Sequence, residues 1–484
     1  MKKKSIGVSA VVNGIKTIIS VIFPLITYPY ISRILEVDNI GRYNFSHSVI
    51  DYFYLLSALG ITTYAVREGT KYRDSRESIS KFASEVFTIN IFSTVLSYIL
   101  LGIIILVSPK LQGYSSIIFV LSISMLFTTI GCEWVYAIYE EYLYIALRTI
   151  AFQAISLLLM FALVRTKDDV LWYAVVIVVS NSGANVVNML GLRKYCKIRP
   201  CLSRSLLVHM IPILILFANS VATRIYVNSD ITILGFLTTD YNVGIYTIAS
   251  KIYSITKQVL SAVIIVSIPR LSLLWGQNRK EEYAKLANRI LYMLVTLVLP
   301  AVVGFFNLSK DVILVISTSE FVTAEMPLCI LSGALLFCLF NWFYTSCVLI
   351  PCGREKQVLI ATVISAVVNV ELNFVLIPVL QESAAALTTL IAEACSLLIC
   401  ILNSRDIIKV EKKWRDIEST VIGCVLVFVV CHVIKGFALG SIATIGLAII
   451  VSVFLYLTLL FALRNSSVKF VTSEIMGRIK RRHS

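Results

Sequence analysis

The chain has 484 residues, of which 58% are hydrophobic, and its mean hydropathy is +0.86. Soluble domains are about 45–50% apolar, so this composition argues against an ordinary soluble fold. The net charge is +15 although charged residues make up only 15% of the chain. A nucleic-acid-binding protein carries such charge on a soluble fold, whereas a membrane protein places it in cytoplasmic loops. We therefore expect an all-α integral membrane protein with no nucleic-acid partner.

Long apolar segments recur along the whole chain. A helix needs about 20 mainly apolar residues to cross the hydrocarbon core, and helices satisfy their own backbone hydrogen bonds there. By this criterion we predict about 14 transmembrane helices. They lie near residues 8–32, 43–66, 85–107, 115–135, 144–164, 170–192, 208–238, 242–268, 287–306, 325–350, 357–378, 383–403, 418–436 and 441–463.

The distribution of Lys and Arg predicts the orientation of these spans. With the N-terminus inside, far more of these residues fall in inner segments than in outer ones, as the positive-inside rule requires. Lys2, Lys3 and Lys4 precede an apolar stretch without a small-residue cleavage site, so we interpret this stretch as the first span rather than a signal peptide. An even number of spans places both termini, including the basic tail at 478–482, in the cytoplasm. We expect a multi-pass protein of the cytoplasmic membrane, in contact with membrane lipids.

An internal repeat suggests two related halves. Residues 39–46 (NIGRYNFS) resemble residues 242–249 (NVGIYTIA), at the predicted starts of the second and eighth spans. The offset is about 203 residues, and the same offset carries Arg67 onto Arg270. We interpret the glycine of each copy as allowing a tight turn. We predict two pseudo-symmetric six-helix halves, at 1–200 and 201–408, followed by a helical pair with a basic tail at 409–484, an arrangement that secondary transporters use for alternating access.

The cysteines and histidines do not indicate a metal or a cofactor. The eleven cysteines lie mostly in apolar runs without a CxxC pair, where cysteine behaves as a small hydrophobic residue. The four histidines are scattered without ligand spacing. We therefore expect no metal site, no cofactor and no disulfide framework.

Ionisable residues within the predicted spans are the candidate functional residues. Each costs at least about 2.5–3.5 kcal/mol at bilayer depth, so such residues usually face the bundle interior. A polar stripe with helical spacing on the first span contains Asn13 and Lys16, and another on the eighth contains Lys257. The predicted substrate-binding residues are Asn13, Lys16, Arg224, Lys251 and Lys257; the predicted coupling or counter-ion residues are Asp51, Asp230, Glu371 and Glu393; and the predicted gate or inner-end basic residues are Arg67, Arg148 and Arg270.

These residues predict a hydrophilic cavity between the halves that is richer in positive than in negative charge. Lys and Arg suit phosphate oxygens, so an anionic substrate is favoured. The alternative is internal pairing, such as Arg224 with Asp230 or Lys251 with Asp51. For Arg148 and Glu133 we favour snorkelling or a local ion pair.

Several short motifs resemble those of the polysaccharide-unit flippases, the O-antigen and capsule repeat-unit exporters of the multidrug/oligosaccharidyl-lipid/polysaccharide superfamily. They cover about residues 8–300, and the usual glycine after the first motif is replaced by Glu36. The motifs are YISRIL at 30–35, GRYNF at 41–45, YF at 52–53, GI at 60–61, YAVRE at 64–68, EW at 133–134, VGIYTIASKI at 243–252 and IPRLS at 268–272.

The resemblance implies a V-shaped bundle of two six-helix halves plus a helical pair, and no enzymatic activity. It also implies a polyprenyl-diphosphate-linked oligosaccharide as the substrate, carried from the inner to the outer leaflet for O-antigen or capsule assembly. Polysaccharide polymerases and glycosyltransferases would be its partners. The alternatives are a multidrug or cation extruder, or a lipid II flippase, of the same superfamily. A membrane polysaccharide polymerase or acyltransferase is disfavoured, because no catalytic constellation or long outer loop is evident.

Overall fold

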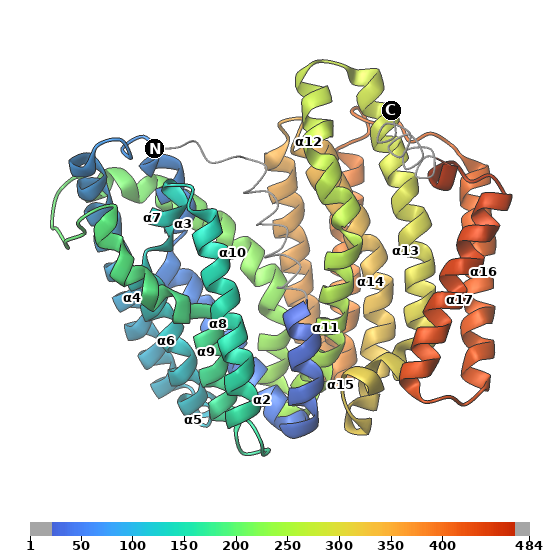
Figure 1. The fold of residues 1–484 in the computed structure, drawn as a ribbon, viewed down its shortest axis with the longest axis horizontal. Helices are drawn as coiled ribbons and strands as arrows, with labels where there is room; N and C mark the ends of the chain where they lie inside the picture. Colours follow the sequence, from blue (N-terminus) through green and yellow to red (C-terminus); the bar gives the residue numbers. More distant parts are fainter. Residues whose placement is uncertain (1–21, 470–484) are drawn as a thin grey trace. The chain divides into compact units, whose positions relative to one another are not determined.

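The computed structural model describes residues 22–469, which form helices and connecting loops without a strand (Figure 1). The fold is therefore all-helical over this range, as the sequence predicts. Most of the predicted first span, together with Asn13 and Lys16, lies outside the described residues. The chain divides into two compact units, unit 1 at Met1–Gly244 and unit 2 at Ile245–Ser484. The boundaries predicted from the sequence, at 200 and 408, stay a prediction.

Unit 1 consists of antiparallel helices joined by short loops. After the helical residues 22–34, its helices are α2 (Glu36–Ala58), α3 (Ile61–Gly69), α4 (Arg76–Val107), α5 (Pro109–Gln112), α6 (Ser115–Gly131), α7 (Glu133–Ile138), α8 (Tyr142–Leu163), α9 (Val170–Gly191), the short 3-10 helix η1 (Leu192–Lys194) and α10 (Leu206–Leu237).

Unit 2 begins within α11 and contains the longest helices of the chain. Its elements are α11 (Asp240–Leu260), α12 (Ala262–Gly276), α13 (Lys280–Ile316), η2 (Ser319–Ala324), α14 (Glu325–Phe343), η3 (Tyr344–Leu349), α15 (Glu355–Leu402), α16 (Trp414–Gly436) and α17 (Ser441–Ala462).

Ten helices in the described part of the chain are long and apolar enough to cross a membrane, and the bent pair α11–α12 is an eleventh candidate span. The sequence-based number of about 14 differs for identifiable reasons. The first predicted span is largely undescribed, and α6 has only 17 residues. The two spans predicted at 357–378 and 383–403 are the two legs of α15, a 48-residue helix that breaks at Gln381, whose φ is +51°.

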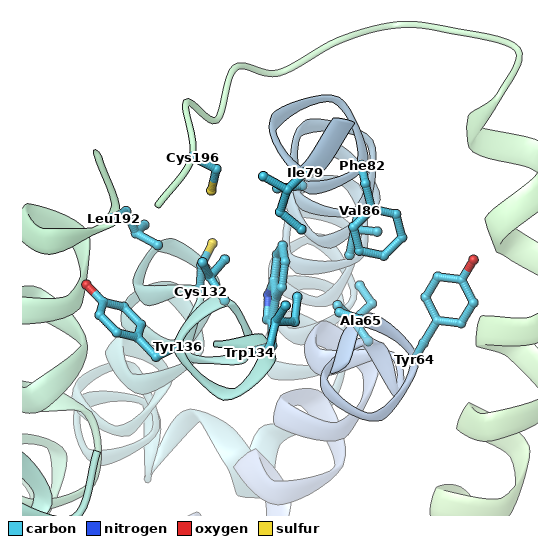
Figure 2. Close-up of a cluster of buried hydrophobic side chains, with 14 of the residues drawn as sticks. Tyr64, Ala65, Ile79, Phe82, Val86, Cys132, Trp134, Tyr136, Leu192 and Cys196 are labelled. Atoms are coloured by element: carbon cyan, nitrogen blue, oxygen red, sulfur yellow. The ribbon is translucent and has the colours of Figure 1, made fainter. Parts of the chain in front are cut away.

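A hydrophobic core of unit 1 lies where α3, α4 and α7 meet. Trp134 lies between Ile79 and Ala65 on one side and Cys132 on the other (Figure 2), and all four of these side chains are buried. Cys132 is 1% exposed and, like the other ten cysteines, forms no disulfide. Cys132 therefore packs as a small core residue.

The glycines of the sequence repeat lie inside helices rather than in turns, so their interpretation as turn residues is wrong. A Cβ atom on Gly41 of α2 would lie 1.8 Å from the backbone oxygen of Asp240, at the start of α11. A Cβ atom on Gly244 would lie 2.3 Å from the backbone oxygen of Val37. The two glycines therefore permit α2 and the first turns of α11 to cross backbone against backbone.

In unit 2, α13, α16 and α17 line an open apolar pocket of about 910 Å³. Its wall includes Pro300 and Gly304 of α13, Val427 of α16 and Ile449 of α17. The long apolar faces of α16 and α17, which the sequence predicts as a separate helical pair, thus pack on α13.

Candidate functional site

The first cluster of predicted site residues lies in unit 1, on α2 and α10. Asp51 of α2 accepts a hydrogen bond from the side-chain amide of Asn228, at 2.7 Å. The guanidinium of Arg224, one turn before Asn228 on α10, lies 3.8 Å from the same carboxylate oxygen. His47, one turn before Asp51, lies 3.5 Å from it. We call these four residues the Asp51 cluster.

The second cluster lies in unit 2, where α11 packs against α14 and α15. The ammonium of Lys257 is 4.0 Å from the carboxylate of Glu393 and lies over the ring of Tyr253, 5.8 Å from its centroid. Cys338 of α14 is an electrostatic neighbour of both charges. The Oε2 atom of Glu393 is buried without a hydrogen-bond partner. We call these four residues the Lys257 cluster.

In both clusters the cation is more exposed than the carboxylate beside it. The side chains of Arg224 and Asp51 are 39% and 20% exposed, and those of Lys257 and Glu393 are 31% and 5% exposed. The separations of 3.8 and 4.0 Å exceed the 2.7–3.2 Å typical of a hydrogen bond. Because the carboxylates do not hold them tightly, both cations have donors to offer to an anion such as a phosphate.

The remaining predicted binding and coupling residues are not part of these clusters as defined. Lys251 is partly exposed on α11, and Asp230, 5% exposed on α10, is an electrostatic neighbour of Tyr52. Glu371 is exposed on the first leg of α15. Asn13 and Lys16 lie outside the described residues.

The polar stripe predicted on α11 is partly satisfied by the helix itself. The hydroxyl of Ser250 donates to the carbonyl of Thr247 at 3.0 Å, and that of Ser254 donates to the carbonyl of Ser250 at 2.8 Å. Such bonds to the preceding turn are common for serine in helices. They leave Lys257 as the member of the stripe best suited to bind an anion.

The basic residues predicted at the inner ends differ in their surroundings. Arg67 is exposed and pairs with the adjacent Glu68 at 3.2 Å, and Arg270 is exposed on α12. Arg148 is buried on α8 and forms an ion pair with Glu133, which confirms the local pairing favoured for these two residues.

Sequence reasoning missed His47, Asn228 and Cys338, which are neighbours of the charged residues of the clusters. Asn228 follows Arg224 by four residues, so helical spacing places both on one face of α10 and could have suggested it. Cys338 carries no such signal, because a cysteine in an apolar run is usually a core residue. Among the described residues, no group of three or more His, Cys, Asp or Glu side chains could hold a metal ion.

Known structures share this architecture. The structure of the lipid II flippase MurJ in an inward closed conformation superposes with a TM-score of 0.74 over 92% of this chain and 97% of its own, at 16% identity. An inward-facing multidrug resistance transporter of the MATE family, a branch of the same superfamily, superposes with a TM-score of 0.54 over 79% of this chain and 97% of its own, at 14% identity. At these identities the likeness concerns the fold alone, which is that of a multi-pass helical membrane protein.

Sequence comparison is more specific than the fold. The profile of the polysaccharide biosynthesis protein family matches residues 6–275, more than half of the chain. The chain therefore belongs to the polysaccharide biosynthesis protein family, the flippase family of the multidrug/oligosaccharidyl-lipid/polysaccharide superfamily that its motifs resemble. It is a transporter-type membrane protein and not an enzyme.

Two curated relatives match in part. A Haloferax volcanii protein described as a probable low-salt glycan biosynthesis flippase is 27% identical, over 37% of this chain and 38% of its own length. An Escherichia coli protein provisionally described as an O-antigen transporter is 22% identical, over 53% of this chain and 63% of its own length. The chain thus matches less than two thirds of the length of either relative.

Proposed function

We propose that the protein carries polyprenyl-diphosphate-linked oligosaccharide units from the inner to the outer leaflet of the cytoplasmic membrane by alternating access, for O-antigen or capsule assembly. Family membership and the named roles of the two relatives support a lipid-linked glycan as the cargo. Polysaccharide polymerase and glycosyltransferases would act on either side of this step. The full count of about 14 spans in two six-helix halves plus a pair belongs to the same proposal.

The observation that carries this proposal is the loose ion pairing of Arg224 and Lys257. A cation that lies 3.8 or 4.0 Å from a more buried carboxylate keeps hydrogen-bond donors that can turn to a diphosphate oxygen while the carboxylate stays beside it. The apolar pocket beside α13 has the chemistry to hold part of an isoprenoid chain. No bond is made or broken; the protein supplies a polar path for a headgroup that would otherwise have to cross hydrocarbon.

Neutralising the cations tests the proposal. Arg224→Gln and Lys257→Gln are expected to lower export at least tenfold in a host that lacks its own flippase, with lipid-linked oligosaccharide accumulating in the inner leaflet. Arg224→Lys and Lys257→Arg should retain part of the activity, because they keep the charge but change the donor geometry. Arg279→Gln is the matched control, because Arg279 pairs with an acid on the exposed end of α13. Normal export by both neutral variants at normal protein levels would contradict the proposal.

A multidrug or cation extruder is the second candidate, because the same clusters also contain Asp51 and Glu393. A cationic cargo would depend on these carboxylates, so Asp51→Asn and Glu393→Gln would then impair function more than loss of Arg224 or Lys257. Resistance to cationic dyes and surface polysaccharide, measured in one set of strains, separate the two functions. Rescue of a strain depleted of its lipid II flippase would instead identify lipid II as the cargo.

A further inference from the structure

A second group of titratable side chains lies in unit 1, away from both clusters, where α3, α4 and α10 meet. His209 of α10 has Tyr64 of α3 at 2.6 Å from its Nδ1 atom and Glu85 of α4 at 3.0 Å from its Nε2 atom. The second carboxylate oxygen of Glu85 accepts a hydrogen bond from the hydroxyl of Ser205 at 2.6 Å. In Figure 2 the hydroxyl of Tyr64 points away from the other labelled side chains. We call these four residues the His209 relay.

The relay is buried, and its side chains are fully hydrogen-bonded when His209 is neutral. Glu85 and His209 are 6% and 9% exposed. With the histidine proton on Nε2, the imidazole donates to Glu85 and its Nδ1 accepts from the Tyr64 hydroxyl, which satisfies every partner. A protonated imidazole also fits, because Nδ1–H can donate to the Tyr64 oxygen once the phenol proton turns away. The geometry therefore accommodates both charge states of His209.

Other charged groups surround the relay at its rim. On α3 and the loop after it, Arg67, Glu68 and Tyr72 are electrostatic neighbours of Tyr64, and on α4, Lys81 is a neighbour of Glu85. Arg67, Lys81 and Tyr72 are exposed, so water and salt screen them. Glu85 is the charged group in hydrogen-bond contact with His209.

Protonation of the relay changes how firmly α10 is held. Ser205 and His209 are four residues apart and both bind Glu85, so this carboxylate fastens the beginning of α10 to α4. Charge-assisted hydrogen bonds are about twice as strong as neutral ones. A positive His209 therefore forms an ion pair with Glu85 and a charge-assisted bond with Tyr64, and both are stronger than the bonds that a neutral imidazole forms there. Histidine is the side chain that ordinarily changes charge between pH 5 and 8.

We propose that the His209 relay is a proton-binding site that fastens the beginning of α10 to α3 and α4 when occupied and loosens it when empty. The site goes beyond the proposed cargo, and its test does not depend on export. α10 also carries Arg224 and Asn228 of the Asp51 cluster, so proton binding on the relay acts on the helix that holds this cluster.

Hydrogen–deuterium exchange of the full-length protein in lipid nanodiscs tests the site. Exchange rates are first corrected for the intrinsic pH dependence of amide exchange. The protection factor of residues 206–212 is then expected to rise about fivefold as the pH falls from about 8 to about 6. This factor corresponds to the difference in free energy between a charged and a neutral hydrogen bond. His209→Gln keeps a donor for Glu85 and an acceptor for Tyr64 but does not titrate, so its protection should not vary with pH. His432→Gln, on α16 beside Phe428, is the matched control and should behave as wild type.

Two results would overturn the site. One is protection of residues 206–212 that does not vary with pH in the wild-type protein, and the other is an unchanged pH response in His209→Gln. If His209→Gln fails to fold, Tyr64→Phe provides the second test. This variant retains the His209–Glu85 pair and removes one of the two bonds that protonation strengthens. The pH-dependent change in the logarithm of the protection factor should therefore shrink to about half of the wild-type change. A full response in Tyr64→Phe would also contradict the relay.

Discussion

Two small residues determine how closely α2 and the start of α11 can approach. Asp240 follows Val37 at the same spacing as Gly244 follows Gly41. The Gly41–Asp240 and Gly244–Val37 contacts are therefore equivalent under the sequence repeat. The repeat thus has a structural explanation at this crossing, because each copy supplies one glycine and one backbone carbonyl.

Adding a methyl group at this crossing should destabilise unit 1. Gly41→Ala would place Cβ against the backbone oxygen of Asp240, which cannot move aside as a flexible side chain can, and overpacking of this kind costs about 1–3 kcal/mol. Thermal unfolding in detergent measures the change. Gly102→Ala on α4 is the control, because a Cβ there meets nothing within 4 Å and alanine favours helix. Equal stability of the two variants would mean that the crossing is not tightly packed.

The buried pair of Arg148 and Glu133 is a second site where one residue determines stability. Arg148 lies 5.5 Å from the centroid of the Tyr144 ring, and its Nε and Nη1 atoms are buried without hydrogen-bond partners. Glu133, which is 43% exposed, is the acid that neutralises it. The arginine therefore depends on this acid for most of its compensation.

Removal of the acid should cost more than removal of both charges. Glu133→Gln leaves a buried guanidinium uncompensated and is expected to lower the free energy of unfolding by about 2 kcal/mol, less than for a fully buried pair because Glu133 is partly solvated. The double variant Glu133→Gln/Arg148→Met should recover part of this loss. Glu140→Gln, which breaks the exposed pair with Arg73, should change little. A double variant less stable than Glu133→Gln would contradict the argument.

At the scale of the helices, the sequence predicts where the helices lie better than it predicts where they bend. Long apolar runs place α4, α8, α9, α16 and α17 within a few residues, except that α4 begins about nine residues earlier than its apolar run. The polar stretch at Gln381–Glu382 correctly separates the two spans that form the legs of α15, because the helix breaks at Gln381. The sequence leaves α11 and α12 joined, however, whereas they bend by 42° beside Ser261.

Arg354 joins the two ends of α15 from outside the spans. Its guanidinium donates to the Asp406 carboxylate at 2.8 Å and to the carbonyl of Asn403, just beyond the helix, at 2.5 Å. The hydrogen bond from Arg354 lowers the pKa of Asp406 below its ordinary value of 3.8. Since the folded pKa is the lower one, the contact stabilises the fold above the unfolded pKa and is lost as the pH falls through the folded value.

Acid should therefore release the segment after α15. Amide protection of residues 403–408 is expected to fall as the pH drops below about 3.8. Asp406→Asn should show low protection already at neutral pH and no further loss in acid, as hydrogen–deuterium exchange can measure. Glu282→Gln, which breaks the exposed pair with Arg279, should keep the acid response. A response that persists in Asp406→Asn would assign it to another group.

The site shows which parts of a membrane protein can be predicted from one sequence. The charges themselves stand out, because each is rare within an apolar span. The partners of these charges cannot be predicted from the sequence, since Asp51 and Arg224 are far apart in the chain and only the packing of α2 on α10 brings them together. For the same reason, the sequence alone gives His209 no partner, because Glu85 and Tyr64 belong to other helices.

The two ends of unit 1 differ in charge, which predicts its orientation in the membrane. At one end, Arg73 binds Glu140 and Arg76 binds the carbonyl of Arg193, so the basic segments after α3 and α9 lie there together. α4 crosses to the opposite end, where Lys110 donates to the carbonyl of Thr238. The second end carries fewer Lys and Arg residues. The positive-inside rule therefore predicts that the first end of unit 1 faces the cytoplasm.

Single cysteines at the two ends test this orientation. All eleven native cysteines are free of disulfides, so their removal breaks no cross-link. In that background, Asp74→Cys and Gln112→Cys introduce exposed thiols at opposite ends of α4. A membrane-impermeant maleimide should label Gln112→Cys in intact cells and Asp74→Cys only after permeabilisation. The reverse labelling pattern would contradict this orientation of unit 1.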